Sequence, residues 1–122
     1  MLTPKFIVIP KRMEESIVNQ WNIPEWIEKD VIERDKVCVY CGVPFTTFNR
    51  CRKTSPSWEH IVNDVKIVTI ENICRCCMSC NSSKGTKDLA DWFESAYCKT
   101  KGITAETVAN VVKMALINPP HI

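Results

Sequence analysis

The spacing of apolar and polar residues along the chain predicts helices towards both ends and short strands in the middle. Apolar residues return every three or four positions over 24–34, where Pro24 suits the first turn of a helix. The same period predicts a helix after Thr86 that extends to Tyr97, and another over 104–116. The positions that carry these patterns are Ile23, Trp26, Ile27 and Val31, then Leu89, Trp92, Phe93, Ala96 and Tyr97, and last Val108, Val111, Val112 and Ala115.

The middle of the chain consists of short runs of strand formers separated by turn residues. Strands are expected around 58–62 and near 73–76, the first bounded by Ser57 and by the polar residues 63–64. A short helix is expected over 78–84, because Gly85 suits the residue that follows a helix end. A short helix over 13–20, a tight turn over 38–42 and a loop or hairpin over 43–56 complete the prediction, whose fold class is α+β.

Length and composition suit one small domain. The chain has 122 residues, of which 45% are hydrophobic, and this is enough for a modest core. We expect a core over about 23–98, an N-terminal extension over 1–22, and a C-terminal helix and tail over 99–122. No apolar run approaches the roughly 20 residues that cross a bilayer, so no membrane association is expected.

The net charge of +2 does not by itself indicate a nucleic-acid-binding protein, but the charges are unevenly placed. Acidic residues crowd the N-terminal third, whereas 72–87 contains no acid and carries Arg75, Lys84 and Lys87. Arg50, Arg52 and Lys53 form a second basic cluster. A locally basic middle could attract a polyanion, and solvated loops are the competing interpretation.

Eight cysteines are many for this length, and residues 1–10, broken by Pro4 and Pro10, are not expected to act as a secretory signal. A reducing cytoplasm is therefore expected, where clustered cysteines hold metal more often than they form disulfides. The pairs Cys38/Cys41 and Cys77/Cys80 each have C-x-x-C spacing, and four thiolates in two such knuckles form a closed, structural zinc site. Redox chemistry and a chance spacing of the cysteines are the alternatives.

The second pair is ambiguous, because Cys74 and Cys77 have the same spacing. We prefer Cys77/Cys80, which lies at the start of the predicted helix, whereas Cys74 lies within a strand. The cysteines left over are expected to be small buried apolar residues, and they are Cys51, Cys74, Cys76 and Cys98.

Four polar residues stand in a fixed order around these cysteines. Glu59 and His60 lie on the first predicted strand, Asn72 precedes the second, and Asn81 directly follows Cys80. The pattern E-H…N…C-x-x-C-N-x-x-K-G resembles the HNH endonuclease family, in which a ββα-metal site lies between two zinc knuckles. The resemblance covers about 23–93. Two positions differ from the commonest family pattern, with glutamate in place of aspartate at Glu59 and asparagine in place of histidine at Asn81.

The resemblance implies a role for each of these residues. His60 is the expected general base, since an imidazole accepts a proton near neutral pH. Glu59 and Asn81 would hold one divalent cation through oxygen, which favours Mg²⁺ or Mn²⁺. Asn72 would fasten the loop between the strands and keep the imidazole oriented. Phosphate or DNA backbone contacts are expected from Arg50, Arg52, Lys53, Arg75, Lys84 and Lys87.

The function that follows from the resemblance is hydrolysis of phosphodiester bonds in double-stranded DNA. The chain would carry a structural Zn²⁺ and a catalytic Mg²⁺ or Mn²⁺. One site per chain would nick one strand, unless a homodimer or successive nicks cut both. The competing functions are a non-catalytic zinc-ribbon module, which does not need Glu59, His60 and Asn81 together, and a thiol redox protein.

Overall fold

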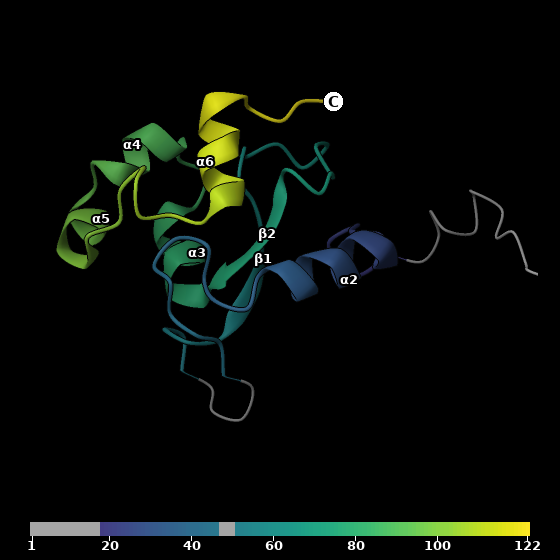
Figure 1. Cartoon of the computed structure of the whole chain (residues 1–122), viewed down its shortest axis with the longest axis horizontal. Helices are drawn as coiled ribbons and strands as arrows, with labels where there is room; N and C mark the ends of the chain where they lie inside the picture. The colour runs from purple at the N-terminus through teal and green to yellow at the C-terminus, as the bar shows by residue number, and fades with distance from the viewer. Residues whose placement is uncertain (1–17, 47–50) are drawn as a thin grey trace, which may run out of the picture.

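The computed structural model of the chain describes residues 18–46 and 51–122 (Figure 1). Arg50 and residues 13–17 of the short N-terminal helix that the sequence predicts lie outside these ranges. The end of that expected helix, residues 18–20, is not helical, because Val18 forms an isolated β-bridge with Pro24.

The sheet is a hairpin of two antiparallel strands, β1 (Pro56–His60) and β2 (Ile73–Cys77). Glu59 lies opposite Cys74, and Trp58 lies opposite Arg75. Because successive side chains of a strand point to opposite faces, Glu59 and Cys74 share one face of the hairpin, and Trp58 and Arg75 share the other. The faces therefore have different chemistry, although both are partly buried.

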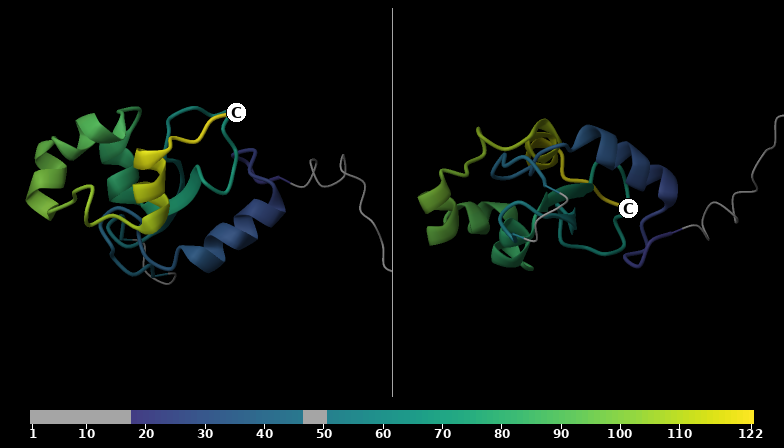
Figure 2. Two further views of the ribbon diagram at one scale, coloured as in Figure 1. Left: turned by 45° about the horizontal axis from the view of Figure 1, so that its top comes forward. Right: turned by 90° about the horizontal axis from the view of Figure 1, so that it is seen from below.

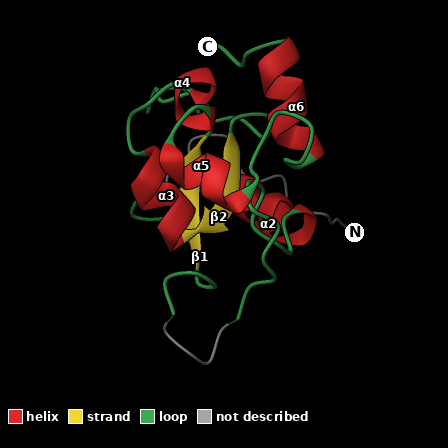
Figure 3. Ribbon diagram, turned by 90° about the vertical axis from the view of Figure 1, so that its left-hand side faces the viewer, coloured by secondary structure: helices red, strands yellow, loops and turns green. Residues whose placement is uncertain are grey.

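Helices cover both faces of this hairpin. Helix α2 (Glu25–Arg34) lies on one side and α3 (Met78–Lys84) on the other (Figures 1 and 3). The chain then forms α4 (Leu89–Phe93) and α5 (Ala96–Lys101), which lie on the side of α3, and last α6 (Asn110–Ile117) (Figure 2). An α+β fold with a two-stranded antiparallel sheet is thus confirmed. None of the helices in the described part of the chain has the length and apolar character that a membrane crossing requires.

Helix α2 begins after Pro24, as predicted, because the fixed φ of proline suits a helix start. Ile23, Ile27 and Val31 are at most 2% exposed and pack on Ile73 of β2, with Trp58 beside them. Trp26 was expected on the same apolar face, but its side chain is 52% exposed. The buried stripe therefore follows an i, i+4, i+8 row, and this row does not include Trp26.

The single helix expected over 89–97 is two helices. Glu94 ends α4, and Ser95 starts α5 by accepting a hydrogen bond from the backbone N–H of Cys98 at 3.3 Å. Leu89 and Trp92 are buried as predicted, whereas Ala96 is exposed. A serine that can cap a helix therefore divides an otherwise continuous apolar pattern.

The last helix also starts later than the predicted residue 104. Thr104 N–H donates to Thr107 Oγ1 at 2.8 Å, and Glu106 N–H donates to Thr104 Oγ1 at 3.2 Å. Such local bonds compete with helical hydrogen bonding, so the segment forms turns and α6 begins only at Asn110. The backbone N–H of Ala109 donates to the backbone carbonyl of Val39 at 2.8 Å, and this bond joins the segment to the first cysteine knuckle.

Candidate functional site

Two segments far apart in the sequence bring four cysteine side chains together. Cys38 and Cys41 come from the turn after α2, Cys77 ends β2, and Cys80 lies in the first turn of α3. Their sulfur atoms all lie within 4.8 Å of one another. These are the four cysteines that the preferred pairing predicts, and Cys74 is not among them.

Each C-x-x-C pair has the same local geometry. The N–H of Cys41 donates to Cys38 Sγ at 3.4 Å, and the N–H of Cys80 donates to Cys77 Sγ at 3.4 Å. Gly42 follows the first knuckle with a φ of 79°, a conformation that glycine adopts at little cost. The two pairs are thus equivalent half-sites, each with a backbone N–H that stabilises a thiolate.

The geometry and the donor set suit a zinc ion. A tetrahedral ion with Zn–S bonds of about 2.3 Å places its ligand sulfurs roughly 3.8 Å apart, and Cys41 Sγ lies 3.9 Å from Cys77 Sγ. The hydrogen bond with Cys41 lowers the pKa of the Cys38 thiol, whereas the bond with Cys38 raises the pKa of the Cys80 thiol. Four thiolates this close can all ionise only when a cation neutralises them. The cluster could therefore hold a structural zinc, with Cys41 as its half-exposed member.

The other cysteines differ in burial. Cys74, Cys76 and Cys98 have no exposed surface and belong to the main apolar core, as expected. Cys51 was expected to be buried too, but it is exposed. It follows the segment 47–50 in a loop whose backbone binds the start of α3, so it does not reach the core.

Asn72 fastens the loop that joins the two strands. Its side chain is fully buried, and its Oδ1 accepts from the N–H of Val62 at 2.7 Å. Its Nδ2 donates to the carbonyl groups of Val62 at 3.1 Å and Ile67 at 3.0 Å. Because both backbone groups of Val62 bind this side chain, β1 ends at His60 rather than at the expected residue 62. These bonds fasten the loop, and the predicted effect of Asn72 on the orientation of the His60 imidazole stays a prediction.

Glu59 forms a buried ion pair with Lys84. Lys84 Nζ lies 2.7 Å from Glu59 Oε2, and the two side chains are 0% and 8% exposed. The hydroxyl of Tyr40 donates to the same oxygen at 3.2 Å, and Lys84 Nζ also donates to the carbonyl of His60 at 3.3 Å. Burial raises the pKa of Glu59, while Lys84 opposes that shift. The sequence predicts that Lys84 contacts a phosphate, but a side chain without exposed surface does not reach one in this arrangement.

Asn81 lies one helical turn before Lys84 and faces the same strand. Its Nδ2 donates to Ser57 Oγ and to the carbonyl of Trp58, both at 3.0 Å. These two bonds fix the amide so that its oxygen remains available as a ligand atom. The side chains of Glu59 and Asn81 thus both lie between β1 and α3, and the ammonium group of Lys84 is the positive charge next to Glu59.

His60 is the last residue of β1, and one nitrogen of its imidazole makes no hydrogen bond with the described residues. The Nε2 atom is buried and has no hydrogen-bond partner in ranges 18–46 and 51–122. Burial lowers the pKa of the imidazole, and the nearby charge of Lys84 lowers it further. The neutral form therefore predominates at neutral pH. A buried ring nitrogen without a partner is uncommon in a folded chain, and it suggests a missing ligand.

The basic residues proposed for DNA contact have different surroundings. Arg52, Lys53 and Lys87 are exposed, and Arg52 donates to the hydroxyl of Ser82 on α3. Lys87 donates to the carbonyl of Ser83 at 3.1 Å, so it lies at the end of the same helix. Arg75 is half-buried on β2 among aromatic rings.

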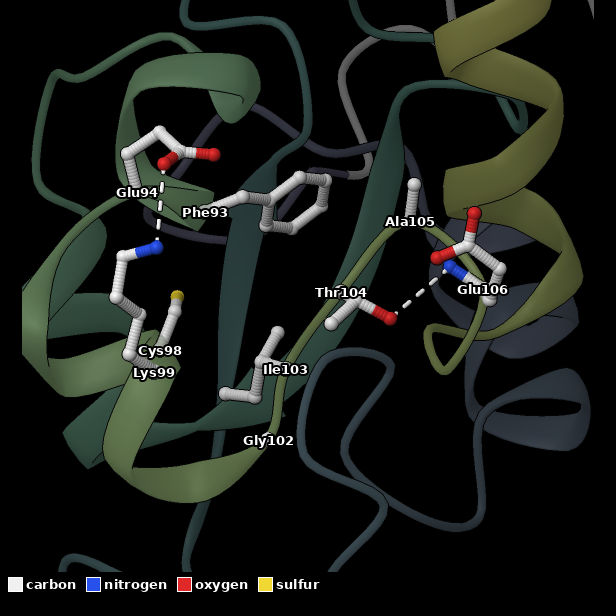
Figure 4. A pocket seen from close by; sticks show the side chains of 9 residues that line it. All are labelled: Phe93, Glu94, Cys98, Lys99, Gly102, Ile103, Thr104, Ala105 and Glu106. Carbon is white, nitrogen blue, oxygen red and sulfur yellow. Dashed lines mark hydrogen bonds and ion pairs between the residues drawn. The ribbon is translucent and has the colours of Figure 1, made fainter.

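A separate hollow of about 460 Å³ lies between α4, α5 and the segment after Gly102 (Figure 4). Phe93, Cys98 and Ile103 line it, and the ion pair of Lys99 with Glu94, at 3.2 Å, crosses one side. None of the predicted catalytic, metal or DNA-binding residues lines this hollow.

Sequence reasoning missed two tyrosines that touch the site. Tyr40 binds Glu59, and the hydroxyl of Tyr97 donates to Cys80 Sγ at 3.3 Å. Tyr40 lies between Cys38 and Cys41, and this position inside the first knuckle is the sequence signal that could have identified it as part of the site. No pattern in the sequence links Tyr97 to Cys80.

Comparison with protein-family models, curated proteins and solved structures found no match to this chain.

Proposed function

We propose that the chain is a metal-dependent DNA endonuclease of the HNH type, with His60 as the general base. The order of elements supports this proposal: a strand carrying Glu59 and His60, a loop fastened by Asn72, a second strand, and a helix carrying Asn81. The cysteine cluster lies where the second strand meets that helix. This arrangement agrees with the order and spacing on which the family resemblance rests.

The observation that carries the proposal is the state of the His60 imidazole. Its backbone is fixed from both sides, by the pairing of β1 with β2 and by the hold of Asn72 on the residues that follow. Its Nε2 is buried and has no partner among the described residues, and the proposed mechanism requires a water molecule to take that position. A neutral imidazole in this state accepts a proton from water that attacks a phosphodiester.

Glu59 and Asn81 are the proposed ligands of the catalytic Mg²⁺ or Mn²⁺. When bound, such an ion stabilises the charge that develops on a leaving oxygen. The oxygen of Asn81 suits this role, but Lys84 already neutralises Glu59 at 2.7 Å. The residues therefore fit a divalent cation only when Lys84 gives up or shares the carboxylate. Arg52, Lys53 and Lys87 provide the exposed positive charge for double-stranded DNA.

Plasmid cleavage tests the function. Zinc-loaded protein is incubated with supercoiled plasmid, with and without Mg²⁺ or Mn²⁺, and the relaxed and linear forms are measured. We expect His60→Ala to lose activity at least about 10²-fold, the lower end of a general-base contribution. His121→Ala is the matched control, because it removes the other histidine, which is exposed near the C-terminus. Equal cleavage by wild type and His60→Ala would refute the assignment.

A zinc-containing DNA-binding module without catalysis is the second candidate, and the ion pair of Glu59 with Lys84 favours it. A carboxylate saturated by a lysine and a tyrosine also serves as a structural element of a core. Such a module would bind the plasmid yet leave it intact with either metal. An endonuclease would retain DNA binding in Glu59→Gln and lose cleavage, so measuring both binding and cleavage in this variant separates the candidates.

A further inference from the structure

The hydroxyl group of Tyr97 donates a hydrogen bond to the cysteine cluster from a separate part of the chain. It lies 3.3 Å from Cys80 Sγ, whereas Cys38 Sγ and Cys77 Sγ accept from backbone N–H groups of the knuckles themselves. A phenol keeps its proton at neutral pH, so the oxygen is the donor and the sulfur is the acceptor. The bond therefore comes from α5, an element that supplies none of the four cysteines.

The Tyr97 ring is held in place by its neighbours. It stacks on the ring of Trp92, with ring centres 6.1 Å apart and an angle of 25° between the planes. Trp92 is fully buried, and its Nε1 donates to Ser83 Oγ at 2.9 Å. Lys101 Nζ lies 5.4 Å from the centre of the Tyr97 ring. Because packing already restricts this ring, its hydroxyl can bond to sulfur with little further loss of conformational entropy.

Packing alone does not explain why residue 97 carries a hydroxyl group. The apolar pattern of the sequence predicts Tyr97 as a core residue of one helix with Trp92, but Ser95 starts a second helix and Tyr97 lies in its first turn. The side chain is only partly buried there, and its polar end reaches a sulfur atom. A phenylalanine would stack on Trp92 equally well. The hydroxyl therefore requires an explanation from the cluster.

The charge of a metal-loaded cluster supplies that explanation. A divalent ion held by four thiolates leaves an excess of two negative charges, and the cluster belongs to the main apolar core, where Cys77 and Cys80 are at most 1% exposed. A buried charge is unfavourable unless hydrogen-bond donors share it. The hydroxyl of Tyr97 is such a donor, and the ammonium group of Lys101 adds positive charge on the ring that carries it.

We infer that Tyr97 is a positioning residue of the zinc site, whose hydroxyl shares the negative charge of the Cys80 thiolate and thereby sets the strength of that sulfur as a ligand. Tyr97 does not touch the ion and acts through Cys80. The second knuckle then differs electronically from the first, although their backbone geometry is the same. The inference does not depend on the proposed nuclease function, because a zinc-containing binding module would have the same site.

Cobalt in place of zinc makes the donor strength of the sulfurs measurable, because tetrahedral Co²⁺–thiolate sites absorb light by charge transfer from sulfur to metal. Tyr97→Phe keeps the ring and removes the hydroxyl, so the sulfur electrons of Cys80 are held less tightly and the charge-transfer band should move to longer wavelength. Tyr40→Phe is the matched control. It removes the same group inside the first knuckle, but this hydroxyl donates to Glu59 Oε2 at 3.2 Å rather than to a sulfur, so the band should stay at its wild-type position.

Zinc affinity gives a second measurement. Competition with a chromophoric chelator should show about tenfold weaker binding in Tyr97→Phe, the lower end of the effect of losing a hydrogen bond to a metal ligand. Because zinc binding and folding are expected to be one process, a loss of packing would weaken binding too. Weaker binding with an unmoved charge-transfer band would therefore assign Tyr97 a packing role and overturn the inference.

A band that moves equally in Tyr97→Phe and Tyr40→Phe would also overturn the inference, since the shift would not be specific to the bond with Cys80. If Tyr97→Phe does not bind cobalt, the wild-type sequence with its two tyrosines replaced by 3-fluorotyrosine supplies the answer. Fluorine makes a phenol a stronger donor, so the band should then move to shorter wavelength. A band that stays in place in the fluorinated protein would overturn the inference equally.

Discussion

At the scale of single residues, Asn72 shows how one buried amide determines where a strand ends. Three hydrogen bonds join its side chain to Val62 and Ile67, at 2.7, 3.1 and 3.0 Å. These bonds replace the pairing that a longer hairpin would make, and they lie directly after His60 in the chain. The loop and the orientation of the proposed base therefore depend on the same side chain.

Asn72→Ala should lower the free energy of unfolding by about 3 kcal/mol, since each of three buried hydrogen bonds contributes roughly 1 kcal/mol. Urea denaturation monitored by tryptophan fluorescence measures this change. Asn63→Ala is the control, because Asn63 is exposed in the same loop, and it should change stability by less than about 0.5 kcal/mol. Equal effects of the two substitutions would mean that the loop is not fastened as described.

Individual contacts were the part of the site that the sequence predicted least well. The four cysteines and Asn72 follow from spacing and from the family resemblance. The ion pair of Glu59 with Lys84 does not, because its partners are 25 residues apart and meet only after α3 packs on β1. Lys84 lies one helical turn after Asn81, and that spacing alone indicates that both face the strand. The surroundings of the Arg75 side chain also depend on tertiary packing, which places the ring of Phe45 beside its guanidinium.

At the scale of elements, the pattern located both strands and the helices α2, α3 and α6, but it merged α4 with the start of α5 and misplaced several ends. Apolar periodicity identifies which face of a segment is buried, and it does not register a local hydrogen bond that stops a helix. The break before α5 depends on Ser95, and the late start of α6 depends on Thr104 and Thr107. In both cases a hydroxyl group provides a local alternative to helical hydrogen bonding.

Ser95→Ala should destabilise the protein by about 1 kcal/mol, because it removes the cap of α5. Thermal unfolding by circular dichroism reports the change. Thr100→Ala is the control within the same helix, where the residue is exposed and alanine is the better helix former. Stability that is unaffected by Ser95→Ala would show that the cap contributes little and that packing alone separates α4 from α5.

At the scale of the whole molecule, the cysteine cluster joins parts of the chain that the sequence keeps apart. The turn after α2, the end of β2 and the start of α3 meet there, and Tyr97 adds α5 through its bond to Cys80. The main apolar core surrounds the same four cysteines. Folding and metal binding are therefore expected to be one process, as in other small proteins with structural zinc.

We expect one zinc ion per chain by elemental analysis, and a strong chelator should unfold the protein as it removes the ion. Cys77→Ser and Cys80→Ser should lose the zinc or fail to fold. Cys74→Ser and Cys98→Ser should retain it, because these buried cysteines lie outside the cluster. Zinc lost from Cys74→Ser but kept by Cys80→Ser would mean that the second knuckle was paired wrongly.

The uneven burial of the four thiols has a consequence for how the ion is exchanged. Cys38, Cys77 and Cys80 are at most 1% exposed, whereas Cys41 reaches the surface. If the cluster holds an ion, an incoming donor from another molecule would therefore reach it on the side of Cys41, and release would begin at that thiolate. Binding and loss of the ion would then share a single route. Chemical modification of the Cys41 sulfur would therefore keep the protein in the metal-bound or the metal-free form that it had before the modification.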